Sequence, residues 1–127
     1  MKKLIILVAL SFFGCQADTD EYYIKYSIEG SLTSSSIGGG IDLVLNNENG
    51  EQLELTVGRS GLTETTIGPV PYGFVASMLA MDNSTRDNLR LYANILVSKN
   101  CGPFALKAMD ESDEVRKTVS LDYTIDF

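Results

Sequence analysis

Apolar and polar side chains alternate along most of the chain after residue 21. Positions 22, 24, 26 and 28 are Tyr or Ile, and residues 89–98 and 115–127 repeat the pattern, with Lys117 as the one charged residue on the apolar face of the last stretch. A period of two places one set of side chains against a core and the other toward solvent, so each stretch predicts a half-buried β-strand.

Two shorter alternating stretches predict a hairpin. Ile41, Leu43 and Leu45 alternate with polar residues, and the same happens in residues 53–57, with Asn49-Gly50 between the two. If both apolar sets face one core, Leu45 opposes Leu53, Leu43 opposes Leu55 and Ile41 opposes Val57, because a one-residue slip would turn one set outward. That register excludes a two-residue Asn-Gly turn. It predicts the three-residue loop 48–50, with Gly50 in the left-handed conformation.

The remaining segments complete an all-β pattern. Residues 31–40 predict a flexible loop, and 63–67 predict a short edge strand that ends at Gly68-Pro69, since proline does not donate to a ladder. Residues 74–81 are almost wholly apolar and predict a strand buried on both faces; a short helix is the alternative, and eight residues without helix caps favour the strand. With seven or eight strands and no helical period, residues 22–127 predict a single immunoglobulin-like antiparallel β-sandwich.

Residues 1–14 have the character of a signal peptide. Lys2 and Lys3 precede a ten-residue apolar stretch, which is too short for the roughly 20 residues of a membrane-spanning helix but has the length of a signal peptide's apolar region. The alternative is a buried N-terminal strand or helix. Because the sequence becomes polar and acidic directly after Gly14-Cys15, a cleaved leader is the favoured interpretation.

The Gly14-Cys15 pair resembles the lipobox of bacterial lipoproteins. Phe12 and Phe13 stand where the strict pattern has Leu and a small residue, and this looser form is similar to lipoproteins of the Bacteroidota. The resemblance implies cleavage before Cys15, a diacylglycerol thioether on its sulfur, and anchoring to the outer membrane on its periplasmic or surface face. Several acyl chains would hold firmly, since each buried CH₂ contributes about 0.8 kcal/mol.

Residues 15–21 would then form an acidic tether. It resembles the tether of surface-exported lipoproteins, and a plain solvated linker is the alternative. Since a lipid would occupy the Cys15 sulfur, Cys101 would have no second cysteine of the chain with which to pair. With no His in the chain and only Lys99 nearby, a nucleophilic role for Cys101 is not expected.

The composition excludes several classes of function. The chain has 127 residues, 17 acidic and 10 basic side chains, no His and two Cys, and its sequence pI is about 4.4. This charge argues against a nucleic-acid partner, which clustered Lys and Arg would hold. The absence of His removes the commonest general base and metal ligand. The acidic cluster in residues 110–114 lacks the spacing of a calcium loop and is interpreted as a soluble turn, so no metal or cofactor is expected.

Tyr23 and Tyr92 are the candidate interaction residues. Both fall on the polar faces of their strands, and tyrosine combines flat apolar area with a hydroxyl; the alternative is cross-strand packing. Tyr22, Tyr26 and Tyr123 fall on apolar faces and are expected in the core.

The strand pattern as a whole loosely resembles small immunoglobulin-like lipoproteins and the soluble domain of MmpS-type transport accessory proteins. The resemblance implies an envelope β-sandwich that acts as a non-catalytic binding or transport-accessory module with a protein or glycan partner. One alternative is a carbohydrate-binding surface lipoprotein. The other is a small hydrolase that uses the carboxylates of Asp82, Asp87, Asp110 and Asp113.

Overall fold

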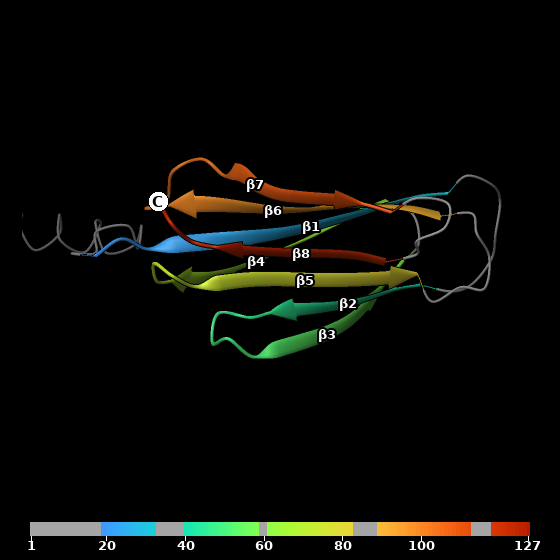
Figure 1. The fold of residues 1–127 in the computed structure, drawn as a ribbon, viewed down its shortest axis with the longest axis horizontal. Helices are drawn as coiled ribbons and strands as arrows, with labels where there is room; N and C mark the ends of the chain where they lie inside the picture. The colour runs from blue at the N-terminus through green and yellow to red at the C-terminus, as the bar shows by residue number, and fades with distance from the viewer. Residues whose placement is uncertain (1–18, 33–39, 59–60, 83–88, 113–117) are drawn as a thin grey trace, which may run out of the picture.

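The computed structural model describes residues 19–32, 40–58, 61–82, 89–112 and 118–127. These residues form eight strands: β1 (Tyr22–Leu32), β2 (Ile41–Asn46), β3 (Gln52–Val57), β4 (Gly61–Val70), β5 (Val75–Asp82), β6 (Leu89–Lys99), β7 (Ala105–Glu111) and β8 (Thr118–Thr124). They make two antiparallel sheets (Figure 1). The first sheet has the order β4-β1-β6-β7 and the second sheet the order β3-β2-β5-β8. The predicted all-β sandwich of seven or eight strands is confirmed.

The connectivity of the sandwich is distinctive. Strand β1 pairs with both β4 and β6, whereas β2 lies in the other sheet beside β3 and β5. Constant-type immunoglobulin domains place their first two strands side by side in one sheet. The two-layer architecture therefore matches the expectation, while this strand order divides the first two strands between the layers.

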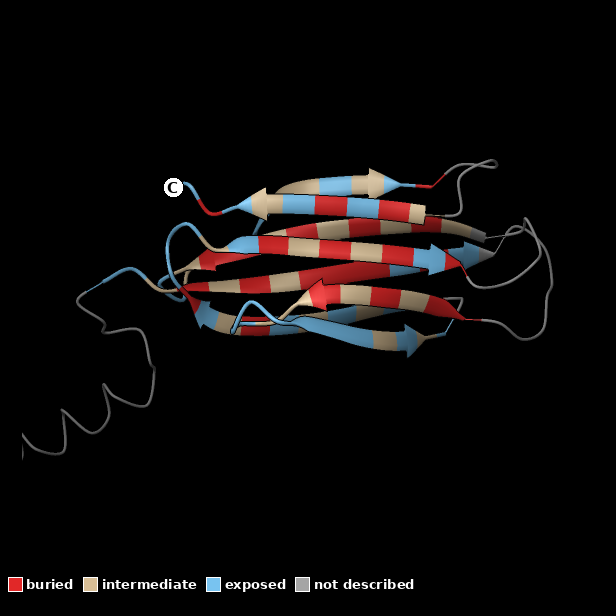
Figure 2. Ribbon diagram, turned by 60° about the horizontal axis from the view of Figure 1, so that its bottom comes forward, coloured by how far each residue is buried: buried red, intermediate tan, exposed pale blue. Residues whose placement is uncertain are grey.

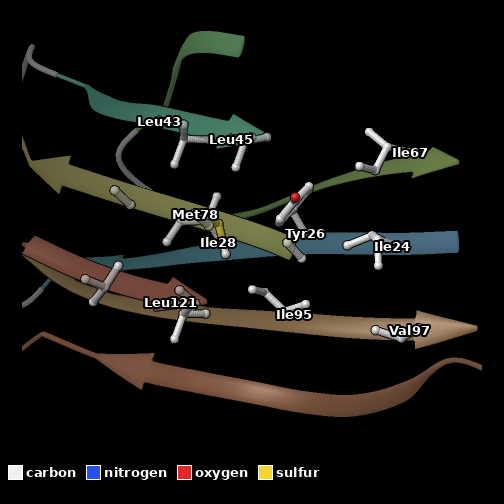
Figure 3. Packing of buried hydrophobic residues seen from close by; sticks show 14 of the residues in the cluster. Ile24, Tyr26, Ile28, Leu43, Leu45, Ile67, Met78, Ile95, Val97 and Leu121 are labelled. Carbon is white, nitrogen blue, oxygen red and sulfur yellow. The ribbon is translucent and has the colours of Figure 1, made fainter. Parts of the chain in front are cut away.

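The core lies between the inward faces of the two sheets (Figure 3). Most alternate residues of the central strands are buried, as the alternation predicts, so Figure 2 shows buried and partly exposed bands following one another along these strands, whereas the edge strands β3 and β7 contain no buried residue. The first sheet contributes Tyr22, Ile24, Tyr26, Ile28, Leu91, Ala93, Ile95 and Val97. The second sheet contributes Ile41, Leu43, Leu45, Ala76, Met78, Ala80, Val119 and Leu121.

The β2–β3 hairpin has the predicted register and loop. Leu45 opposes Leu53, and the Asn47 N–H donates to Glu51 O over 2.8 Å to close the loop 48–50. Gly50 has a φ of 78°, the left-handed value that its position requires. The apolar face of β3 is only partly covered, however, because β3 is an edge strand, and Leu53 remains 37% exposed.

Strand β4 continues past the point where the sequence predicts it to stop. It runs through the cis Gly68-Pro69 bond to Val70, and the register against β1 shifts by a bulge between Tyr22 and Ile24. The bulge lets the ladder resume beyond the proline. The predicted edge position is confirmed, because β4 is the outer strand of the first sheet.

Two further predictions are corrected by the structure. Strand β5 is buried on one face only: Ala76, Met78 and Ala80 point into the core, while Val75 and Met81 are exposed, because none of the described segments forms a third layer over the outer face of the second sheet. The predicted loop 31–40 begins later than expected, since β1 continues to Leu32; residues 33–39 lie outside the described part of the chain.

One end of the sandwich gathers several turns together with both ends of the described chain. Tyr22 opposes Lys99 and Val70, and Val75 opposes Thr124, so the β4–β5 turn, the β6–β7 turn and residues 125–127 all lie at this end (Figure 1). We call it the Asn100 end, after the turn residue that contacts the incoming chain. We call the opposite end, where β1 ends and β4 begins, the far end.

Candidate functional site

The incoming chain is fixed to the β6–β7 turn two residues before β1 begins. Asn100 Nδ2 donates to Asp20 Oδ1 over 2.8 Å, and Lys99 Nζ lies 3.5 Å from the other carboxylate oxygen of Asp20. The Glu21 N–H donates to Asn100 Oδ1 over 2.9 Å, and the Asn100 N–H donates back to Glu21 O over 2.7 Å. The hydrogen bond from Asn100 is the main cause that lowers the pKa of Asp20; desolvation opposes it, and Lys99 lowers the pKa further. The last two residues of the predicted tether 15–21 are therefore bound to the fold.

The β6–β7 turn has a backbone that few side chains adopt. Asn100 and Cys101 have φ values of 51° and 60°, the left-handed pair of a tight hairpin turn. The Gly102 N–H donates to Lys99 O over 3.0 Å, and Ser98 Oγ donates to Gly102 O over 2.6 Å. The turn is thus held by its own hydrogen bonds as well as by Asp20 and Glu21.

Cys101 is disulfide-bonded, so the expectation that it is left over as a thiol is wrong. The predicted cleavage and lipidation site, Gly14 and Cys15, lies outside the described residues. The chain has two cysteines. An intramolecular disulfide and a thioether would therefore compete for the sulfur of Cys15.

The two candidate tyrosines, Tyr23 and Tyr92, share the outer face of the first sheet but do not form one site. Tyr23 opposes Ser98 on β6, and six residues of that strand, roughly 20 Å, separate Ser98 from Tyr92. Both side chains are half-buried. The Tyr23 ring covers Gly68, where an added Cβ would lie 2.7 Å from its Cδ2 atom. Tyr23 therefore packs across strands, whereas Tyr92 stands between Glu29 and Glu111 at the far end.

The core tyrosines have structural roles. Tyr22 and Tyr26 are buried, as predicted, and Tyr123 is half-buried against the core. The Tyr123 hydroxyl donates to Asp126 Oδ1 over 2.7 Å, and burial, followed by this hydrogen bond, raises the pKa of Tyr123 to about 12. Tyr22 donates to the Phe127 carbonyl and fixes the C-terminal segment.

The most exposed tyrosine is one that the sequence analysis did not select. Tyr72 is 64% exposed in the turn 71–74 between β4 and β5, which is closed by the Phe74 N–H donating to Pro71 O over 3.1 Å. We call these four residues the Tyr72 turn. The signal that would have identified it is the Pro-Tyr-Gly sequence at the centre of residues 65–81, a stretch that contains no charged side chain.

An open groove of about 360 Å³ lies on the outer face of the second sheet. Its walls are Asp42, Leu43, Val44, Glu54, Leu55, Thr56 and Met81. Thr56 Oγ1 donates to Asp42 Oδ1 over 3.0 Å across the β2–β3 ladder. The groove thus combines apolar side chains such as Val44 and Met81 with the two carboxylate-bearing side chains Asp42 and Glu54.

The charge of the two sheets differs. Strands β2, β3, β5 and β8 contain no Lys or Arg and carry Asp42, Glu54, Asp82 and Asp122. The strands of the first sheet carry Lys25, Arg90, Lys99 and Lys107 beside four acids. The groove in the second sheet is consequently suited to a partner that offers a cation together with an apolar group.

Two of the four carboxylates considered for hydrolysis, Asp82 and Asp110, are in the described residues, and they lie in different sheets. Asp82 is buried at the end of β5 in the second sheet, and Asp110 lies on β7 of the first sheet, where its Oδ2 accepts a hydrogen bond from the Ser120 N–H over 3.1 Å. Asp110 thereby joins β7 to the edge of β8. Asp87 and Asp113 lie outside the described residues. In the described ranges, no three potential ligands come together as a metal site would require.

Comparison with known proteins found no matching family model and no curated protein with significant sequence similarity. Within the part of the chain that the structure describes, no helix has both the length and the apolar character needed to cross a membrane.

Proposed function

We propose that this protein is a lipid-anchored β-sandwich of the bacterial cell envelope that acts as a non-catalytic binding or transport-accessory module. The observation that carries the proposal is the apolar leader that ends at Gly14-Cys15, followed five residues later by Asp20, whose side chain is hydrogen-bonded to Asn100 of the fold. A chain cleaved before Cys15 would have only five residue steps between its lipidated residue and Asp20.

The binding role is supported by the open surfaces of the second sheet. The groove beside Asp42 and Glu54 is accessible, and β3 is an outer strand on which a partner strand could add by main-chain hydrogen bonding. A glycan partner is the alternative retained from the sequence, and a glycan array probed with the lipid-free domain would test it directly. Binding of one glycan class, abolished by substitutions in the groove, would favour the carbohydrate-binding alternative.

Metabolic labelling with palmitate tests the anchor. Wild type, Cys15→Ala and Cys101→Ala would be expressed in a bacterial host with a lipoprotein-processing pathway. We expect wild type and Cys101→Ala to carry label and Cys15→Ala to carry none, because only the Cys15 sulfur follows the cleavage site. Cys101→Ala is the matched control, since it removes the disulfide but leaves the lipidation site intact.

The same experiment separates the two fates of the Cys15 sulfur. Unlabelled wild type would refute the proposal and would assign that sulfur to the disulfide. Intact mass supplies a second reading, because a processed chain begins at residue 15 and an unprocessed one at Met1.

A further inference from the structure

The Asn100 end is the end of the sandwich to which the lipid would be tied. Since Asp20 is bonded to Asn100 and Lys99, only the five residue steps from Cys15 to Asp20 separate the lipidated residue from the fold. Five extended residues span at most about 18 Å. The headgroup region of a leaflet is roughly 5–8 Å thick, so an anchored sandwich would keep its Asn100 end close to the bilayer surface.

This end presents an uncharged, exposed turn. Tyr72 is the most exposed large apolar or aromatic side chain that the structure describes, and neighbouring Val75 is exposed as well. The turn is not loosely attached: the Gly73 N–H donates to Ile125 O over 3.0 Å, and the Ile125 N–H donates to Phe74 O over 3.0 Å. The Tyr72 turn is therefore a supported projection that carries no charge to desolvate.

Three lysine side chains near this end lie against aromatic rings. Lys107 Nζ lies 3.9 Å from the centroid of the Phe127 ring, and Lys99 Nζ lies 5.8 Å from the same centroid. Lys25 Nζ lies 4.4 Å from the Phe104 ring centroid. These lysines would stand beside the lipid headgroups, while the Tyr72 turn offers the apolar contact.

We infer that the Tyr72 turn inserts into the headgroup layer of the membrane that carries the lipid anchor, with Tyr72 as an interfacial aromatic residue; this inference rests on the proposed function. Tyrosine suits the position because its ring is apolar and its hydroxyl is polar, the combination found at membrane–water interfaces. A short tether also raises the effective concentration of the turn at the bilayer, so a weak contact suffices.

The inference fixes the orientation of the molecule. The Asn100 end would face the bilayer, and the strands would extend from it away from the membrane. The groove would lie toward the far end, since Asp42 opposes Met81 and Thr56 several residues beyond Asn46, the last residue of β2 at the Asn100 end. A partner approaching the groove would therefore meet it away from the lipid surface.

Single tryptophans test the insertion, because the chain contains none. Residues 1–127 would be expressed in a host with a lipoprotein-processing pathway as Tyr72→Trp and, for comparison, as Leu62→Trp, and the product that the host makes would be purified. Leu62 is 58% exposed against 64% for Tyr72, and it lies near the other end of β4, about 30 Å along the strand. Each variant would be reconstituted in phosphatidylcholine vesicles with and without bromine on the acyl chains, and vesicle flotation would be measured on the same samples.

We expect both variants to float with the vesicles. The fluorescence of Tyr72→Trp should shift to shorter wavelength and be lost on brominated lipid, whereas Leu62→Trp should keep its emission. Flotation with equal, unquenched emission from the two variants would overturn the inference and leave the anchor standing. Failure of both to float would overturn the proposed function and the inference with it. A blue shift of Tyr72→Trp in native envelope membranes but not in vesicles would assign the turn to a protein partner instead.

Discussion

Replacing Tyr26 with phenylalanine should weaken the sandwich although it removes one atom only. The Tyr26 side chain starts on β1 of the first sheet, and its hydroxyl oxygen (red in Figure 3) reaches the second sheet. There it donates to Asn46 O over 2.8 Å and accepts from the Ser77 N–H over 3.3 Å. The β2–β5 ladder pairs Leu45 with Met78 and goes no further, so the hydroxyl takes the place of the next backbone bond.

The expected cost of Tyr26→Phe follows from these two contacts. Removing the Tyr26 hydroxyl leaves Asn46 O and the Ser77 N–H, both partly buried, without this hydrogen-bond partner. Such a loss lowers the free energy of unfolding by about 1–3 kcal/mol. We expect a lower urea midpoint with an unchanged slope, and a melting temperature that falls by about 4–8 °C for each kcal/mol. Tyr72→Phe is the matched control, because it removes the hydroxyl of an exposed tyrosine. Equal midpoints for Tyr26→Phe and wild type would refute the bridging role.

Alkaline pH offers a second measurement of the same bridge. Burial raises the pKa of Tyr26 to about 12 from an ordinary value of 10.0, while the Ser77 N–H opposes the shift. Between pH 10 and pH 12 the unfolded chain therefore loses this proton while the folded chain keeps it, so stability must fall as pH rises. Tyr26→Phe should show a shallower decline over that interval. The part that remains is expected from Tyr123, whose pKa is also raised to about 12.

Two further substitutions test the bulge and the attachment of the incoming chain. Gly68→Ala should destabilise the fold by at least about 2 kcal/mol in urea unfolding, since Gly68 has a φ of 139° and a new Cβ would lie 2.9 Å from Tyr22 O. Gly58→Ala is the control and should be near neutral, because a Cβ at Gly58 would meet no atom within 4 Å. Equal losses of stability in the two variants would contradict this reasoning. Asp20→Ala should reduce stability at neutral pH by an amount that vanishes in acid. Because the pKa of Asp20 is lower in the folded chain than its ordinary value of 3.8, the ionised carboxylate stabilises the fold at pH values above 3.8. This stabilisation is lost as pH falls through the lowered pKa. A difference in melting temperature that does not change with pH would argue against the Asn100 and Lys99 contacts.

The sequence predicts core positions and register most reliably where they depend only on a strand and its immediate neighbours. The apolar positions of residues 22–28 all lie in the core, because β1 is central and has neighbours on both edges. The hairpin register is recoverable for a similar reason: Leu45 and Leu53 must lie on the same face, and only the loop 48–50 allows this.

Features set by the second layer and by the strand order are not predictable from local pattern. The apolar run in residues 74–81 suggests burial on both faces, yet nothing in a local pattern tells whether a third layer exists. The continuation of β4 past Pro69 depends on a bulge opposite Tyr22 and Ile24, which only the pairing with β1 reveals. Likewise, Tyr72 comes shortly before the apolar strand β5 in sequence and is exposed because it lies in the turn at the end of the sandwich.

The two sheets differ in charge, and this difference bears on both the attachment of the chain and the groove. The first sheet fixes the incoming chain through Lys99 and balances its acids with cations, whereas the strands of the second sheet carry acids alone. Because like charges repel, anionic partners would be disfavoured at the groove, and a cationic segment would be steered toward it with a strength that falls as salt is added. A tether short enough to hold the Asn100 end at the membrane would keep that groove turned away from the lipid. Attachment and recognition would then use different parts of the sandwich, so that neither surface obstructs the other.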